Sequence, residues 1–317
     1  MRVYGLGLKV ERQNEIVVMQ LAHSVGAFPK VRGAFNNGVV YEHFPGRIMN
    51  YHDLVKPEVI KKLTKKLHDF HYVDGKNVNL VGMRGEPASK DQMPKRTWSM
   101  LKEYIIDLIP DEHPDDKLKQ KFQAFRKDFP DEVLLEEFNY IQNVLDEMRI
   151  PDDALQHGDV HPRNLLINDE TGDIVLIDYE LTAHGARTQD LGRFIEMKPV
   201  LEEFGGWVEK DEPDFTADVR QLWLQTYLET KIKAEGGSVE SITEEQIELF
   251  DIEVKAFSII AEFEMIAFCG VPFNFEEGFF NPFGTLAGCT KRYYAQKADL
   301  IVLKDRYLQL REKGVNI

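Results

Sequence analysis

The residues best suited to chemistry lie in the segment 157–164, which reads HGDVHPRN. Asp159 and Asn164 are five positions apart, and 14 positions after Asn164 an apolar run ends in Asp178. One carboxylate can position an acceptor hydroxyl, while an amide oxygen and a second carboxylate can hold Mg²⁺ against nucleotide phosphates. The spacing therefore predicts phosphoryl transfer, with Asp159, Asn164 and Asp178 as catalytic residues and the last two as metal ligands.

Two interpretations of Asp159 and Asn164 compete. Both residue types make ordinary loop turns, so the pair alone is a weak signal. Asp178 at the end of the next strand makes the catalytic interpretation the better one. We expect this Asp at the tip of a β-hairpin within 155–178, and we expect His157 and His161 to brace the loop by hydrogen bonds. The nine histidines do not pair with cysteine at zinc-ligand spacings.

The elements that must position these residues form a short mixed region and then a long helical one. Residues 1–4 resemble the end of a strand, and 14–25 has the apolar spacing of a helix. Strands at 30–35 and 39–44 flank Asn37-Gly38, a hairpin signal because both turn positions accept φ > 0. We expect further helices at 57–73, 98–109, 115–125, 132–148, 188–197, 214–235, 243–269 and 286–312.

This order of elements predicts an α+β fold with two lobes, of the protein-kinase type. A small β-rich lobe with the hinge would occupy 1–46. A large, mostly helical lobe would occupy 47–317 and carry the catalytic hairpin near its start.

The small lobe and hinge suggest how a nucleotide is held. Kinases place a cation on a strand of the small lobe and pair it with a helical glutamate. Arg2 and Glu15 fit those two positions, and a surface ion pair of little energetic value is the alternative. Tyr41, Glu42 and Phe44 would line the adenine cleft as the segment between the lobes.

Two charged residues follow Asp178 closely. We expect Asp190 to open a helix at 191 as its N-cap, and Arg187 to pair with acidic groups near the site. Both roles are structural.

Composition restricts the class of protein. With 39 basic and 54 acidic residues the formal charge is −15, which disfavours nucleic acid as a partner. Two cysteines, Cys269 and Cys289, make no disulfide framework and fit a reducing compartment as small apolar residues. The N-terminus lacks an apolar signal core, and the apolar stretch 257–268 is interrupted by glutamates, so we expect no membrane span. We expect a cytoplasmic protein.

The motif set resembles the choline/ethanolamine kinase family. The likeness rests on 157–164, on Ile177-Asp178-Tyr179-Glu180 and on Arg187 with Asp190. It extends to the small-lobe segments 2–5, 26–30 and 35–42, with the ethanolamine branch closest, and to the helix around 254–268. The resemblance implies a protein-kinase-like fold, ATP and Mg²⁺ as cofactors, and phosphorylation of a small amino alcohol such as ethanolamine or choline.

Three departures from the family pattern concern the substrate site and the start of the chain. Gly158 stands where the family usually has Asn. The resulting His-Gly-Asp form is more like the wider aminoglycoside-phosphotransferase group. The aromatic residues that would recognise a quaternary ammonium are depleted, with Leu181 and Met265 at two of those positions. The candidate substrate residues are Glu180, Glu196, Glu264 and Phe268. A solvated Glu264 and a core Phe268 are the alternative for the late helix.

The third departure is the start of the chain at the strand that carries Arg2. The two strands and glycine-rich loop that precede it in the family are not found, which predicts either a shortened sequence or weakened nucleotide binding. An exposed strand edge also favours association, which makes a homodimer a candidate assembly. Two other functions stay open: a catalytically weak or inactive pseudokinase with a regulatory role, and a kinase for another small alcohol.

Overall fold

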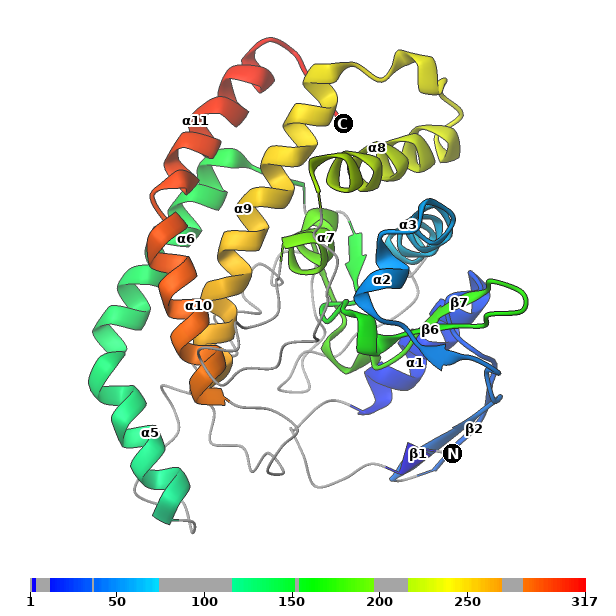
Figure 1. The fold of residues 1–317 in the computed structure, drawn as a ribbon, viewed down its shortest axis with the longest axis horizontal. Coiled ribbons are helices and arrows are strands. Elements are labelled where there is room, and N and C mark those ends of the chain that lie inside the picture. The colour runs from blue at the N-terminus through cyan, green and yellow to red at the C-terminus, as the bar shows by residue number, and fades with distance from the viewer. Residues whose placement is uncertain are drawn as a thin grey trace.

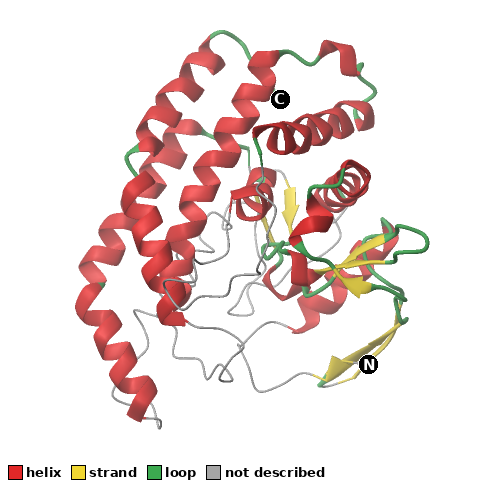
Figure 2. Ribbon diagram, in the orientation of Figure 1, coloured by secondary structure: helices red, strands yellow, loops and turns green. Residues whose placement is uncertain are grey.

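The structure, a computed structural model, describes residues 2–3, 12–35, 37–73, 116–151, 154–196, 216–269 and 282–317. A small antiparallel sheet with one helix lies near the N-terminus, and long helices make up most of the rest (Figures 1 and 2). The predicted α+β class is confirmed. Within the described part of the chain, no helix combines the length and apolar character needed to cross a membrane.

The N-terminal sheet has the strand order β1-β3-β2, with β1 (Arg2–Val3), β2 (Val31–Phe35) and β3 (Gly38–Tyr41) all antiparallel. Helix α1 (Arg12–Ser24) packs beside it. Phe35 pairs with Gly38 across the hairpin. Gly38 is therefore a strand residue, and the predicted turn at Asn37-Gly38 was placed one residue too late.

A second small sheet carries the hairpin that is predicted to be catalytic. Its order is β4-β6-β7, with β4 (Arg47–Ile48), β6 (Leu165–Ile167) and β7 (Ile174–Leu176). The apolar side chains of β6 and β7 are largely buried, as the apolar run in the sequence requires. A two-stranded sheet of β5 (Ala154–Gln156) and β8 (Ala183–Gly185) brackets this hairpin in sequence.

Helix α3 (Pro57–His71) begins with proline at its first turn, which suits a position whose N–H has no helical partner. Its predicted apolar face is buried: Val59, Ile60, Leu63, Leu67 and Phe70. This face packs on α8 (Ala217–Ala234) and on strands β5 and β7. The helix therefore backs the catalytic hairpin from one side.

The long helix α9 (Glu244–Cys269) organises the other helices. It packs against α7 (Arg187–Glu196), α10 (Pro282–Gln296) and α11 (Asp299–Glu312), and α11 in turn contacts α6 (Asp131–Met148) (Figure 1). Helix α5 (Asp116–Asp128) precedes α6. The single helix predicted at 286–312 is wrong, because the chain breaks at 297–298 between α10 and α11. The helix expected at 98–109 lies outside the described residues.

Two buried apolar clusters hold the fold together. One joins α1, β3, α3, the catalytic hairpin and α8, and so connects the N-terminal sheet to the helical part. The other joins α5, α6, α9, α10 and α11, and it contains the buried Cys289, as expected for a small apolar residue. The segment 157–164 lies beside the first cluster, which contains Leu155, Val160 and Leu165.

Candidate active site

The backbone brings Asn164 and Asp178 to the same end of the β6–β7 hairpin. Asn164 ends a short 3-10 turn (Pro162–Asn164) and leads into β6, where Leu165 pairs with Leu176. The ladder continues one step further, since the N–H of Ile177 donates to the carbonyl of Asn164 at 2.9 Å. Asp178 thus lies at the open end of the hairpin. Its predicted position at the tip is wrong, because the tip is the turn at 168–173.

Asp159 and Asn164 are joined directly. Asn164 Nδ2 donates to the Asp159 carboxylate oxygen Oδ2 at 3.0 Å and to the Asp159 carbonyl, also at 3.0 Å. These two bonds fix the amide plane and leave the amide oxygen Oδ1 as the atom that can serve a cation. Mg²⁺ needs few protein oxygens when phosphates and water complete its shell, so this donor set fits such an ion.

Asp178 adopts an unusual backbone conformation, with φ 68° and ψ 62°. A non-glycine residue in the left-handed region costs free energy, and such residues cluster at functional sites. The following 3-10 turn (Tyr179–Leu181) is anchored by the buried Tyr179, whose hydroxyl donates to the carbonyl of Ala27 at 3.2 Å. This contact ties the segment after Asp178 to the chain that follows α1.

His157 braces the loop, as predicted. Its Nε2 donates to the carbonyl of Ile177 at 2.9 Å, and its Nδ1 accepts the N–H of Asp159 at 3.3 Å. Burial lowers the pKa of His157, despite the nearby carboxylates of Asp190 and Asp159. The ring is therefore neutral, as its donor and acceptor bonds require.

Asp159 remains ionised at neutral pH. His161 Nε2 lies 3.5 Å from Asp159 Oδ2, while its Nδ1 accepts the N–H of Arg163. Burial raises the pKa of Asp159, but the hydrogen bond from His161 and the charge of Arg193 hold it well below its usual range. A carboxylate that is ionised at neutral pH is available to accept the proton of a hydroxyl.

Asp190 holds the loop that precedes Asp159 rather than capping a helix. Helix α7 already begins at Arg187, so the predicted N-cap is wrong. The Asp190 carboxylate instead accepts the backbone N–H groups of His157 and Gly158, each at 2.8 Å. His71 Nε2 lies 3.1 Å from the same carboxylate. Burial raises the pKa of Asp190, but these partners lower it below its usual value.

Sequence reasoning missed Arg193, which connects the loop to α9. Its Nη1 donates to the carbonyl of Gly158 at 2.7 Å, and its Nη2 forms an ion pair with Glu264. Gln189 Nε2 donates to the other Glu264 oxygen at 3.0 Å. Glu264 is buried, so the alternative of a solvated Glu264 is wrong.

Close packing of α7 on α9 makes this ion pair possible. A methyl group added to Gly192 would lie 2.8 Å from the carbonyl oxygen of Val254. Gly192 immediately before Arg193 is the one sequence signal of that approach. Nearby, the buried Arg187 lies 3.8 Å from the buried Glu253, so it pairs with an acidic group as expected.

The structure describes all the candidate nucleotide-binding side chains except that of Arg2. The Tyr41 ring packs on Phe28 with centroids 5.1 Å apart, and Glu42 forms an ion pair with Arg32. Phe44 is half-buried and its ring contacts Gly46. Glu15 is buried on α1, while the side chain of Arg2 lies outside the described part, so their pairing stays a prediction.

The substrate candidates are spread over three elements. Glu180 is half-buried in the 3-10 turn after Asp178, and Glu264 lies on α9. The side chains of Glu196 and Phe268 lie outside the described part of the structure. Among the described residues, no group of three or more His, Cys, Asp or Glu side chains forms a metal cage.

Comparison with known proteins gives one consistent match. A family model described as choline/ethanolamine kinase covers residues 1–269. Human ethanolamine kinase 1 is 26% identical over 269 residues, which cover 83% of this chain and 54% of the human protein. Ethanolamine kinase of Drosophila melanogaster is 26% identical over 81% of this chain and 46% of its own length. The chain therefore spans about half the length of these two relatives.

Solved structures give the same result for the fold. A Plasmodium vivax ethanolamine kinase superposes with a TM-score of 0.67 at 16% identity, over 93% of this chain and 75% of that one. A Cryptosporidium parvum choline kinase superposes with a TM-score of 0.64 at 17% identity, over 95% and 82%. The predicted two-lobed, protein-kinase-like fold is confirmed.

Proposed function

The chain belongs to the choline/ethanolamine kinase family, and from that premise we propose that it transfers the γ-phosphoryl group of ATP to the hydroxyl of ethanolamine or choline. The hydrogen bond between Asn164 Nδ2 and the Asp159 carboxylate is the observation that carries the proposal. It joins the group that would accept a proton to a group that would hold a metal. Phosphoryl transfer depends mainly on such positioning and on charge neutralisation.

Each catalytic residue has a distinct task in this proposal. Asp159 orients the acceptor hydroxyl and accepts its proton as the oxygen attacks. Asn164 Oδ1 and the Asp178 carboxylate hold Mg²⁺, which neutralises phosphate charge when bound. Their shared place at the open end of the hairpin supports this assignment. Asp190, His157 and Arg193 hold the backbone of the loop around Asp159 by hydrogen bonds. They contact no reacting atom in this proposal.

The nucleotide would lie between the two lobes, 1–46 and 47–317. Arg2, paired with Glu15, contacts the phosphates in this proposal. Tyr41, Glu42 and Phe44 line the adenine side. Burial of Glu15 on α1 supports a paired glutamate there, because a buried carboxylate requires a partner.

The acceptor site favours a primary over a quaternary ammonium. Glu180, Glu196 and Phe268 are the proposed contacts, and a carboxylate can hold a primary ammonium by charge-assisted hydrogen bonds. Leu181 removes an aromatic face that a quaternary ammonium needs. Glu264 already binds Arg193 and Gln189, so its part in the proposal is to position Arg193.

A substrate panel tests the proposal. Purified protein is incubated with ATP and Mg²⁺, and ADP release is measured with ethanolamine, choline, a simple sugar and an aminoglycoside. We expect turnover with ethanolamine, and less with choline. Turnover only with the sugar or the aminoglycoside would assign the site to a different alcohol.

A binding measurement separates the enzyme from a pseudokinase. A ligand that binds the folded state raises its thermal stability. We expect Mg-ATP at millimolar concentration to raise the Tm. No rise in Tm and no turnover with any alcohol would favour a regulatory protein without phosphotransfer.

A further inference from the structure

Arg47 stands where the hinge segment meets the catalytic hairpin. It is the first residue of β4 and pairs with Ile167 of β6, and Ile48 pairs with Leu166. The preceding Gly46 lies so close to β6 that a methyl group there would be 2.7 Å from the carbonyl oxygen of Ile167. The chain leaving the hinge is thus in direct contact with the strand that directly follows Asn164.

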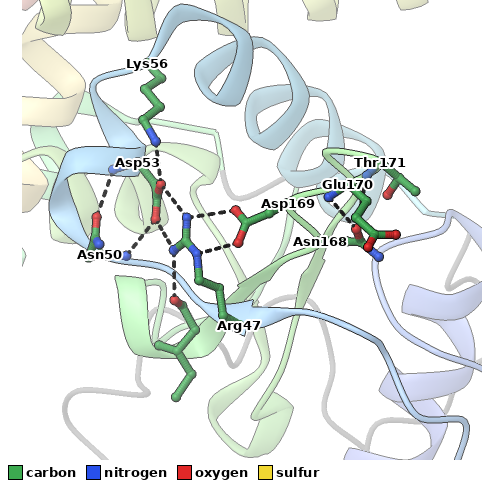
Figure 3. A network of polar contacts seen from close by, with 9 residues as sticks. Arg47, Asn50, Asp53, Lys56, Asn168, Asp169, Glu170 and Thr171 are labelled. Atoms are coloured by element: carbon green, nitrogen blue, oxygen red, sulfur yellow. Dashed lines mark hydrogen bonds and ion pairs between the residues drawn. The ribbon is translucent and has the colours of Figure 1, made fainter.

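The Arg47 guanidinium holds two carboxylates at once, as Figure 3 shows. It donates to both oxygens of Asp53, from Nη1 at 2.6 Å and Nη2 at 2.9 Å. It also donates to both oxygens of Asp169, from Nε at 2.8 Å and Nη2 at 3.0 Å. We call these three residues the Arg47 clamp. Such paired contacts fix direction as well as distance.

The Asp53 side of the clamp is rigid. Asp53 is buried in the short helix α2 (Tyr51–Leu54), with its side chain 2% exposed. Its carboxylate also accepts Lys56 Nζ at 2.8 Å and the N–H of Asn50 at 3.1 Å (Figure 3). Arg47 is therefore tied to a fixed point in the helical lobe.

The Asp169 side of the clamp reaches the tip of the hairpin. Asn168 Oδ1 accepts the N–H groups of Glu170 and Thr171 at 2.9 and 3.0 Å, so the turn is internally ordered. Lys62 Nζ on α3 donates to the carbonyls of Thr171 and Gly172 at 3.2 and 2.9 Å. The strands of the hairpin have only three residues each. A fixed tip therefore restrains the other end, where Asn164 and Asp178 lie.

We propose that Arg47 is a positioning residue that couples the nucleotide hinge to the metal-holding end of the β6–β7 hairpin. Nucleotide and Mg²⁺ then bind cooperatively, because the clamp sets the position of the hairpin relative to the hinge. This inference rests on the proposed function. A coupling of this kind acts in both directions, so the metal strengthens nucleotide binding and the nucleotide strengthens metal binding.

A purely stabilising ion pair is the competing interpretation. The Arg47 side chain is 40% exposed and that of Asp169 is 62% exposed. The exposed Arg47–Asp169 half of the clamp contributes little to folding stability, whereas the half that holds the buried Asp53 does contribute. A purely stabilising ion pair would leave the binding of ATP and Mg²⁺ unchanged. Ligand binding is therefore the quantity that separates the two interpretations.

The test compares the affinity for ATP with Mg²⁺ and with EDTA, by calorimetry, in wild type and Arg47→Met. Substituting a residue that hydrogen-bonds a metal ligand typically changes metal affinity by about 10–100-fold, and Arg47 acts less directly, through the hairpin. We expect the substitution to reduce the enhancement of ATP binding by Mg²⁺ about tenfold and to leave the affinity in EDTA unchanged. Asp169→Asn should reduce the enhancement in the same direction by a smaller factor, because Asp169 is more exposed.

Arg306→Met is the matched control. Arg306 of α11 makes a two-bond ion pair with Glu248 of α9, and its side chain is 39% exposed, close to that of Arg47. Helix α11, which carries Arg306, lies away from the β6–β7 hairpin (Figure 1). The control should keep the full enhancement by Mg²⁺.

Two outcomes would overturn the inference, and they differ in meaning. If wild type shows the enhancement and Arg47→Met retains it, whatever its Tm, the coupling is wrong and the proposed function stands. If wild type binds no ATP under either condition, the proposed function fails and the inference fails with it.

Discussion

The carboxylate of Asp190 accepts the backbone N–H of His157, at 2.8 Å, two residues before Asp159, the proposed proton acceptor. The other Asp190 oxygen accepts the N–H of Gly158 at the same distance. A buried carboxylate that satisfies two consecutive amides fixes the path of the chain between them. The position of Asp159 therefore depends on a residue of helix α7 that lies 32 positions after Gly158 in the sequence.

Asp190→Asn tests this dependence. The amide keeps the volume but has only one accepting oxygen, so one buried N–H is left without its partner. We expect a loss of roughly 1–3 kcal/mol in the free energy of unfolding, with a fall in kcat. Urea unfolding and steady-state kinetics measure both. Asp305→Asn, at an exposed position of α11, should change neither. Unaltered stability and kcat in Asp190→Asn would contradict the role.

The Arg193–Glu264 pair should show strong coupling. Arg193→Met or Glu264→Gln alone leaves one buried charge unpaired, at a cost of roughly 3–5 kcal/mol. The double variant should lose much less than the sum of the two, as measured by a double-mutant cycle in urea. The exposed pair of Lys65 and Asp69 on α3 serves as control, with an expected coupling below about 0.5 kcal/mol. Additive losses at Arg193 and Glu264 would mean that the pair is not formed.

Gly46→Ala tests the contact between the hinge and β6. The added methyl group would meet the Ile167 carbonyl, which belongs to a hydrogen-bonded strand and cannot move freely. We expect a lower Tm and weaker ATP binding. Gly33→Ala in β2, where no atom lies within 4 Å of the added group, should be neutral or stabilising by up to about 1 kcal/mol. Equal Tm values for the two variants would contradict the close approach.

Stability should depend on pH through buried histidines. Burial lowers the pKa values of His157 and His68 below the usual histidine value. Below about pH 6.5 the unfolded chain therefore binds more protons than the folded protein. The stability from these neutral rings is full above that pH and decreases as the pH falls. We expect the Tm to decline from pH 7 to pH 5, and His68→Gln to reduce the slope. A Tm that is constant or rises over this range would contradict the burial of neutral histidine.

Local sequence signals predicted the elements closest to the chemistry. The apolar spacing of α3 gave its buried face, and the Asp159, Asn164 and Asp178 spacing identified one loop and one hairpin. Signals of this kind depend on neighbours in sequence. They were sufficient for the α+β class and for the loop and hairpin that carry the candidate catalytic residues.

Contacts between distant segments were not predictable in the same way. Arg47 and Asp169 are 122 positions apart, and Arg193 and Glu264 are 71 apart. Asp is a residue type that is common at helix N-caps, which is why the sequence predicts Asp190 to be one. Its buried partners in the loop before Asp159 determine its position instead. The break between α10 and α11 at 297–298 contains no glycine or proline, so it left no signal.

The most direct test of the central claim compares catalysis and nucleotide binding in Asp159→Asn. A general base typically contributes a factor of roughly 10²–10⁴ to the rate. We predict that kcat with ethanolamine falls by about that factor while the affinity for Mg-ATP stays as in wild type. Asp159→Asn that turns over ethanolamine as fast as wild type would contradict the assignment of Asp159 and the account built on it.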